Sequence, residues 1–203
     1  MSKKFKIENI YCVGRNYAKH AKELENELPT TPLFFQKSNS TVNTGNTIDI
    51  KKNQNIEHEL EVVIKINKDG TPSNIKEARS YISGFTIGLD LTNRKLQADL
   101  KKKGLPWFMA KTFRGAAVLD ENFISNCPGE FYLIVNEKLK QKGKIKDMIF
   151  TFEEIVLSLS KSVDLKDGDL IFTGTPEGVG PLKSGDQVEI GFTNHPPKKL
   201  VVI

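Results

Sequence analysis

The stretch NIEHELEVVIKI, residues 55 to 66, places two carboxylates at the start of a predicted buried strand. Side chains two residues apart on a strand point to the same face of a sheet. Glu59 and Glu61 therefore share one face. The other face carries the apolar side chains Leu60, Val62, Ile64 and Ile66. Because like charges repel and a buried charge is costly, something has to stabilise this carboxylate pair.

Two environments account for the pair. In the first, water solvates the face that carries Glu59 and Glu61. In the second, a divalent cation neutralises both carboxylates. Val63 lies on the same face and argues against water, but the periodicity by itself leaves both interpretations open.

Composition indicates an ordinary globular protein. The chain has 203 residues, of which 38% are hydrophobic and 27% charged, enough for one sizeable core. No apolar run approaches the roughly 18 residues of a membrane span, and the first residues lack the apolar core of a signal peptide. The two cysteines form neither a disulfide framework nor a metal-type spacing. We therefore expect a cytoplasmic protein with no membrane partner.

The net charge of +5 comes mostly from lysine, with 26 Lys against 4 Arg. Nucleic-acid readers usually combine arginine forks with aromatic platforms. The lysine runs here, such as residues 101–103, have no interleaved aromatic residues. We expect a solvated lysine surface and no nucleic-acid partner. The positive balance also favours acidic small substrates through electrostatic steering.

Strands outnumber helices along the chain. Apolar runs bounded by turn residues predict strands at 9–13, 32–36, 59–66, 82–91, 131–136, 169–173, 187–192 and 199–203. Helical patterns predict helices at 16–25, 75–82, 92–104 and 151–163. The last of these opens with a capping box of Thr151 and Glu154. The pattern predicts an α+β, mainly β fold with few peripheral helices, built as a single domain over residues 1–203.

Asp90 ends the apolar strand SGFTIGLD, and its charge needs a partner. One interpretation is structural: Asp90 caps the helix that begins near Thr92. In the other, Asp90 is a third oxygen ligand of a cation at Glu59 and Glu61. Three carboxylates without a His or Cys cluster suit Mg²⁺ or Mn²⁺ rather than zinc.

Three further features carry polar side chains with more than one interpretation. His20 and Glu23 share one face of the first predicted helix, so the carboxylate can orient the imidazole; the alternative is a solvated surface helix. Lys111 follows an apolar stretch with the only Trp, and either extends to solvent or has a function. The glycine-rich segment 172–186 is no phosphate loop, but its N–H groups and the hydroxyls of Thr173 and Thr175 can face an anion.

In this order, the motifs resemble the fumarylacetoacetate hydrolase family, specifically its short acylpyruvase or oxaloacetate decarboxylase-like branch. They cover nearly the whole chain: YCVGRNYAKHAKE, HELEVVI, GLDLTNRKLQ, KKGLPWFMAKTF, MIF and GDLIFTGTPEGVGPLKSGD. One departure is Ser38, where relatives often have Pro after the Lys. The resemblance favours the cation over water as the partner of Glu59 and Glu61.

The resemblance also implies a fold, an assembly and a set of site residues. The implied fold is the family's mixed β-sandwich roll, and the implied assembly is a homodimer. The implied ligands of Mg²⁺ or Mn²⁺ are Glu59, Glu61 and Asp90. The implied catalytic residues are Lys111 of the AK[ST]F motif and the histidine and glutamate of a mobile lid helix at residues 16–28, which are His20 and Glu23. The candidate substrate contacts are Arg15, Arg94, Gln97 and Thr175.

The implied substrate is a short 2-oxo acid with a second carbonyl or carboxylate, such as an acylpyruvate or oxaloacetate. Its carboxylate and 2-oxo oxygens chelate the ion, which stabilises the enolate formed when a C–C bond breaks. In hydrolysis, His20 takes a proton from the attacking water. Three functions stay open: a metal-dependent C–C hydrolase or decarboxylase, an isomerase or tautomerase on the same scaffold, and a basic non-enzymatic binding protein.

Overall fold

The computed structural model describes residues 6–24, 27–50 and 55–203. Its strands are β1 (Ile10–Gly14), β2 (Leu33–Lys37), β3 (Val42–Asn43), β4 (Thr47–Ile48), β5 (Ile56–His58), β6 (Leu60–Ile66), β7 (Ile82–Asp90), β8 (Thr92–Asn93), β9 (Ala117–Leu119), β10 (Glu130–Val135), β11 (Lys138–Lys144), β12 (Leu170–Phe172), β13 (Gly180–Pro181), β14 (Gln187–Phe192) and β15 (Lys198–Val202). Its helices are α1 (Ala18–Glu23), α2 (Ile75–Arg79), α3 (Arg94–Lys102), α4 (Phe108–Lys111) and α5 (Phe152–Ser160), with short 3₁₀ turns at Asn39–Thr41 and Ile145–Asp147. The predicted α+β, mainly β fold is confirmed.

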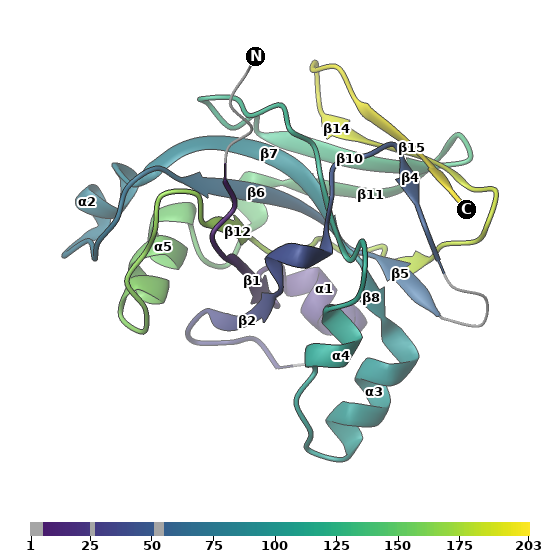
Figure 1. The fold of residues 1–203 in the computed structure, drawn as a ribbon, viewed down its shortest axis with the longest axis horizontal. Helices are drawn as coiled ribbons and strands as arrows, with labels where there is room; N and C mark the ends of the chain where they lie inside the picture. Colours follow the sequence, from purple (N-terminus) through teal and green to yellow (C-terminus); the bar gives the residue numbers. More distant parts are fainter. Residues whose placement is uncertain (1–5, 25–26, 51–54) are drawn as a thin grey trace.

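The strands form three sheets of mixed direction. The largest has the order β2-β1-β12-β6-β7-β9-β3, the second has the order β11-β10-β14-β15-β4, and a small one has the order β13-β5-β8. In the view of Figure 1, α2 and α5 lie at one end of the molecule, α3 and α4 project at another, and α1 lies near the centre. Strands distant in sequence thus become neighbours in the largest sheet.

Strand β6 is buried on both faces. Val62 and Ile64 belong to the main core, together with Phe131 of the five-stranded sheet. Val63, between them, points to a second apolar cluster that contains Phe172. Burying each aliphatic side chain contributes about 1.5–3 kcal/mol. The strand is therefore held firmly from both sides, and the carboxylates at its start are held with it.

Two predicted elements differ from the observed ones near these carboxylates. The strand expected at 59–66 begins at Leu60 as β6. A separate strand, β5, precedes it, and Glu59 lies between the two strands. The helix expected at 92–104 begins only at Arg94, because the Asn93 side chain accepts a hydrogen bond from Leu96 N–H and caps it, 3.2 Å. The interpretation of Asp90 as the helix cap is therefore wrong.

The expected helix at 16–25 is shorter in the structure. The Asn16 side chain donates to the Thr173 carbonyl, 2.8 Å, and accepts from Phe150 N–H, 2.7 Å, which ties Asn16 to neighbouring loops. The helix α1 therefore begins at Ala18, and it ends at Glu23. Residues 25 and 26 lie outside the described residues, and 27 and 28 are not helical, so the lid range 16–28 is not one helix.

The capping box predicted for α5 is confirmed. The Thr151 hydroxyl accepts from Glu154 N–H, and the Glu154 carboxylate accepts from Thr151 N–H at 2.7 Å. The helices are short throughout. Within the described ranges, none is long and apolar enough to cross a membrane.

Candidate active site

The candidate active site lies at one end of the inner strands of the seven-stranded sheet. There β1, β12, β6 and β7 are consecutive neighbours. Strands β1 and β12 run parallel, and β6 is antiparallel to both β12 and β7. The carboxyl ends of β1, β12 and β7 therefore meet the amino end of β6. This arrangement gathers four segments that are far apart in the sequence.

The register of β6 against β7 decides which carboxylates meet. Asp90 N–H donates to the Glu59 carbonyl oxygen at 2.8 Å, which fixes the two residues opposite each other. Glu61 lies opposite Gly88. A Cβ at Gly88 would come within 2.6 Å of the Val118 carbonyl oxygen, so glycine is required for close strand packing beside the site.

Glu59, Glu61 and Asp90 form one buried cluster. Each offers a carboxylate oxygen, and these atoms all lie within 4.8 Å of one another. The residues are only 6%, 1% and 0% exposed, respectively. Solvation by water therefore does not explain the carboxylate pair, and that interpretation is wrong.

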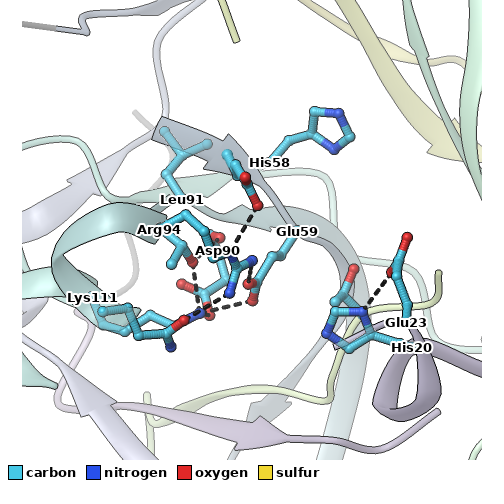
Figure 2. Close-up of polar contacts among 12 residues, drawn as sticks. His20, Glu23, His58, Glu59, Asp90, Leu91, Arg94 and Lys111 are labelled. Atoms are coloured by element: carbon cyan, nitrogen blue, oxygen red, sulfur yellow. Dashed lines mark hydrogen bonds and ion pairs between the residues drawn. The ribbon is translucent and has the colours of Figure 1, made fainter. Parts of the chain in front are cut away.

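Two cations hold Glu59. Lys111 Nζ donates to Glu59 Oε2 at 2.8 Å and to Asp90 Oδ2 at 2.7 Å, and Arg94 pairs with Glu59 Oε1 (Figure 2). Burial alone would raise the pKa of Glu59, but the charges of Lys111 and Arg94 outweigh burial and hold that pKa below its usual range. Burial would lower the pKa of Lys111, but Asp90 and Glu59 outweigh it and raise that pKa. Glu59 is therefore ionised and Lys111 is an ammonium at neutral pH.

Glu61 is in a different electrostatic environment. Gly174 N–H donates to Glu61 Oε2 at 2.7 Å, while Oε1 accepts no hydrogen bond from the residues described. Gly174 has φ +99°, a left-handed conformation that glycine adopts without strain. Burial raises the pKa of Glu61 well above its usual range, and the negative charges of Asp90 and Glu59 raise it further. The ionised form of Glu61 is therefore disfavoured unless a positive charge lies beside its carboxylate.

Asp90 has one oxygen without a hydrogen bond. Its Oδ2 accepts from Lys111, but its buried Oδ1 accepts no hydrogen bond from any described residue, although Lys37 Nζ lies only 2.7 Å away. Lys37 itself is buried and donates to the carbonyls of Leu91, at 3.0 Å, and of Lys111. The Asp90–Lys37 contact is thus a charge pair whose geometry leaves Oδ1 available to another positive group.

These features fit a divalent cation. The donor set consists of three hard carboxylates, and two of their oxygens, Asp90 Oδ1 and Glu61 Oε1, accept no hydrogen bond from the described part of the chain. The raised pKa of Glu61 reflects, after burial, its two negative neighbours, which a cation would offset. Oxygen-only ligands of this kind suit Mg²⁺ or Mn²⁺.

The helix α1 carries His20 and Glu23, the histidine–glutamate pair predicted from the sequence. His20 is only 5% exposed, so the alternative of a fully solvated helix is wrong. With its proton on Nδ1, His20 donates to Glu23 Oε2 at 3.1 Å, and Gly178 N–H donates to Glu23 Oε1 at 3.0 Å (Figure 2). Tyr17, just before the helix, packs edge-on against Phe131 with ring centroids 6.4 Å apart. Mobility of this segment stays a prediction.

A pocket opens above the carboxylates. Its lining includes eight of the predicted site residues: Arg15, His20, Glu59, Glu61, Arg94, Gln97, Lys111 and Thr175. The other two, the buried Asp90 and Glu23, do not line it. Arg94 donates to Gln97 Oε1 and to Glu57 Oε2, each at 2.7 Å, which orients the guanidinium at the pocket wall. Eight of the ten predicted site residues thus line one pocket, and the other two, Asp90 and Glu23, bond to Lys111 and His20 of its lining.

The glycine-rich loop after β12 does not present the free anion site considered above. Gly174 N–H is bonded to Glu61 and Gly178 N–H to Glu23. The Thr173 hydroxyl donates to a backbone carbonyl of β6. The loop therefore positions carboxylates of the protein itself, and only Thr175 among its hydroxyls lines the pocket.

Sequence reasoning did not single out three residues of this region. Lys37 had one signal, a lysine at the end of an apolar strand, and Lys101 was hidden within a lysine run. Gln141 had no local signal, yet it accepts from His58 Nδ1 and donates to Thr175 Oγ1, both at 2.8 Å. The His58 ring points away from the carboxylate cluster (Figure 2).

A buried carboxylate cluster and a histidine held by a glutamate thus lie together on a mainly β scaffold. The family model of the fumarylacetoacetate (FAA) hydrolase C-terminal domain matches residues 9–201. The chain therefore belongs to the fumarylacetoacetate hydrolase family.

Named relatives and a solved structure agree with this assignment. The chain is 39% identical over 192 residues to "Oxaloacetate decarboxylase, mitochondrial" of Dictyostelium discoideum, covering 91% of this chain and 88% of the relative. It is 41% identical over 191 residues to "Oxaloacetate tautomerase FAHD1, mitochondrial" of Arabidopsis thaliana, covering 91% and 86%. A fumarylpyruvate hydrolase from Pseudomonas aeruginosa, solved with Mn²⁺ and pyruvate, superposes with a TM-score of 0.93 at 30% identity, covering 100% and 92%. These relatives are enzymes, which supports an enzymatic role for this chain.

Proposed function

We propose that this protein is a Mg²⁺- or Mn²⁺-dependent enzyme that cleaves a C–C bond in a short 2-oxo acid, as an acylpyruvate hydrolase or an oxaloacetate decarboxylase. The observation that carries the proposal is the cluster of Glu59, Glu61 and Asp90 beneath a cation-lined pocket. The names of the relatives support the substrate class, and the Mn²⁺ of the fumarylpyruvate hydrolase structure supports the metal.

In this proposal, Glu59, Glu61 and Asp90 hold the ion. When bound, the ion supplies Lewis-acid chemistry, which polarises the 2-oxo group and stabilises an enolate. Lys111, bonded to two of the ligand carboxylates, keeps a positive charge beside the enolate. The remaining negative charge of the substrate is balanced from the pocket wall, for which we propose contacts with Arg15, Arg94, Gln97 and Thr175.

His20 is the proposed general base. In the neutral tautomer that carries its proton on Nδ1 and donates it to Glu23, the other ring nitrogen, Nε2, can accept a proton. In hydrolysis, Nε2 takes a proton from the water that attacks the distal carbonyl. Decarboxylation needs no attacking water, and His20 then shapes and closes the pocket. The segment around α1 is the proposed lid: opening admits ligand and closure excludes water.

A second candidate is an isomerase or tautomerase that interconverts keto and enol forms of oxaloacetate or of a 2-hydroxy-dienedioate. The Arabidopsis relative, named an oxaloacetate tautomerase, favours this candidate. Both candidates form an enolate of a 2-oxo acid, by breaking a C–C bond in the first and by removing a C–H proton in the second. The carboxylate cluster therefore serves either one. Loss of the base is expected to harm hydrolysis more than a tautomerisation that needs only the metal.

The test is a turnover panel of acylpyruvates, oxaloacetate and dienedioates, with Mg²⁺ or Mn²⁺ and with EDTA. We expect turnover only with metal. His20→Ala should keep Mg²⁺ affinity by calorimetry and lower acylpyruvate hydrolysis about 100-fold or more, the usual effect of a lost general base. His195→Ala, at an exposed loop position, is the matched control. Normal hydrolysis by His20→Ala with normal metal affinity would show that His20 is no base.

Glu61→Gln separates this proposal from a basic non-enzymatic binding protein. The substitution keeps the size of the side chain but removes its charge, so Mg²⁺ binding and turnover should both be lost. A binding protein would instead be sensitive to charge reversal in the lysine run 101–103 and insensitive at the carboxylates. Unchanged Mg²⁺ affinity in Glu61→Gln would contradict the metal site.

Assembly and location complete the proposal. We propose a homodimer and a small-molecule 2-oxo acid as the partners, and a monomer in sedimentation at micromolar concentration would count against the dimer. The Dictyostelium and Arabidopsis relatives are named as mitochondrial proteins. The cytoplasmic location expected for this chain stays a prediction, to be checked by fractionation.

A further inference from the structure

Four cationic side chains line the pocket, and two of them are already neutralised. Arg94 and Lys111 pair with carboxylates of the site at its floor. The other two are Arg15 and Lys101. Within residues 6–24, 27–50 and 55–203, neither of these two side chains forms a hydrogen bond or an ion pair. The pocket therefore holds two cationic side chains that no carboxylate of the described residues neutralises.

Arg15 is held at the pocket by an unusual backbone conformation. It follows β1 directly and has φ 61°, the left-handed region that non-glycine residues seldom adopt. Such a conformation costs about 1 kcal/mol or more and persists only where its surroundings require it. Asn16, the next residue, is anchored by hydrogen bonds on both sides, which fixes the loop. The guanidinium is thus directed to the site by the fold rather than by a carboxylate partner.

Lys101 is positioned by an aromatic ring. It lies near the end of α3, and its Nζ is 4.7 Å from the ring centroid of Trp107, a cation–π contact. Burial lowers the pKa of Lys101, and the nearby positive charges of Arg15, Arg94 and Lys111 lower it further. Lys101 therefore belongs to the same positive field as the other three cations, and an anion beside it would relieve their mutual repulsion.

A 2-oxo dicarboxylate has two anionic ends that need separate partners. The end with the 2-oxo group is balanced at the carboxylate-bound ion in the proposed function. The second carboxylate is costly to desolvate without a cation or hydrogen-bond donors. Arg15 and Lys101 are the cations left for it, and a hydrogen bond to a charged group is stronger than one between neutral groups.

We propose that Lys101, together with Arg15, binds the second carboxylate of a 2-oxo dicarboxylate, so that Lys101 selects dicarboxylates over 2-oxo acids with a neutral end. This inference rests on the proposed function and names the substrate class of the same site.

The experiment compares oxaloacetate, which has the second carboxylate, with pyruvate, which lacks it and serves as a competitive inhibitor. The metal-loaded enzyme, Lys101→Met and Lys101→Arg are assayed for consumption of oxaloacetate. We expect Lys101→Met to raise KM for oxaloacetate about 10-fold or more, with kcat little changed, as for a lost hydrogen bond to a charged group. The inhibition constant of pyruvate should be unchanged, and Lys101→Arg should restore most of the affinity.

Lys103→Met is the matched control, because Lys103 is an exposed residue of the same lysine run outside the pocket lining. It should leave both constants unchanged. If Lys101→Met raised KM for oxaloacetate and the inhibition constant of pyruvate by the same factor, Lys101 would have a structural role, and the proposed selectivity for dicarboxylates would be refuted. An unchanged KM for oxaloacetate would refute it as well. If the wild-type enzyme turns over no 2-oxo acid with either metal, the proposed function itself fails, and this inference fails with it.

Discussion

Lys37→Met tests whether the buried charges of the site are balanced as the structure indicates. Lys37 has a fully buried ammonium that lies 2.7 Å from Asp90 Oδ1 and donates to the carbonyls of Leu91 and Lys111. Methionine keeps most of the apolar stem and removes the charge. Asp90 would then retain Lys111 as its one ion-pair partner among the described residues, and two carbonyl oxygens would lose a donor.

The expected cost follows from these contacts. Removing one partner of a buried ion pair costs about 3–5 kcal/mol, because the other charge is left uncompensated. For a chain of this length, 1 kcal/mol lowers Tm by about 2–4 °C, so the loss should be roughly 6–20 °C without metal. Saturating Mg²⁺ should narrow the gap, since the ion would supply positive charge next to Asp90 that Lys37 no longer provides.

The assay is thermal and urea unfolding of the wild type and variant, with EDTA and with Mg²⁺. Lys103→Met, an exposed position, is the control and should change stability by no more than about 0.5 kcal/mol. If Lys37→Met were as stable as the wild type in EDTA, Lys37 would not balance the charge of Asp90. If the Tm difference between the two proteins were the same in EDTA and in saturating Mg²⁺, the ion would not replace the charge of Lys37.

Three further substitutions probe the surroundings of the site. Gly174→Ala should destabilise the fold by about 1–3 kcal/mol, because φ is +99° and the new Cβ would lie 2.6 Å from Asn16 Cβ. The strain should displace the N–H that holds Glu61 and so weaken Mg²⁺ binding in calorimetry. Unchanged stability and Mg²⁺ affinity would contradict this. Tyr17→Phe should leave urea stability equal or raise it by up to about 1–3 kcal/mol, since the buried hydroxyl has no hydrogen-bond partner in the described structure; a clear loss would reveal a partner. Burial lowers the pKa of His58 from 6.5, more than its hydrogen bond raises it. The unfolded chain therefore binds this proton more readily, so the His58 contribution to stability is lost as pH falls below about 6.5. His58→Gln should flatten the pH dependence of urea stability between pH 7 and 5, and a parallel profile would contradict the shift.

Much of the scaffold was predictable because its signals are local. Alternating or continuous apolar runs predicted β6, β7 and β14, since burial of a strand face depends on a period of two residues. The capping box predicted the start of α5 for the same reason: Thr151 and Glu154 interact within one turn. Boundaries failed where a distant contact intervened, as at Asn16, whose side chain bonds to a residue 157 positions away.

The sequence by itself determined the chemistry available to this protein: three carboxylates and one histidine–glutamate pair, in the order of a known family. Only the tertiary structure decided how they combine. Strand register sets Asp90 opposite Glu59, and a loop 113 residues away supplies the N–H that holds Glu61. The contacts of Lys37 with Asp90, between segments distant in the sequence, and of Lys101 with Trp107 come from tertiary packing. The physical reason is that side-chain periodicity acts over a few residues, whereas burial and charge pairing are settled by whichever distant segments the sheet brings together.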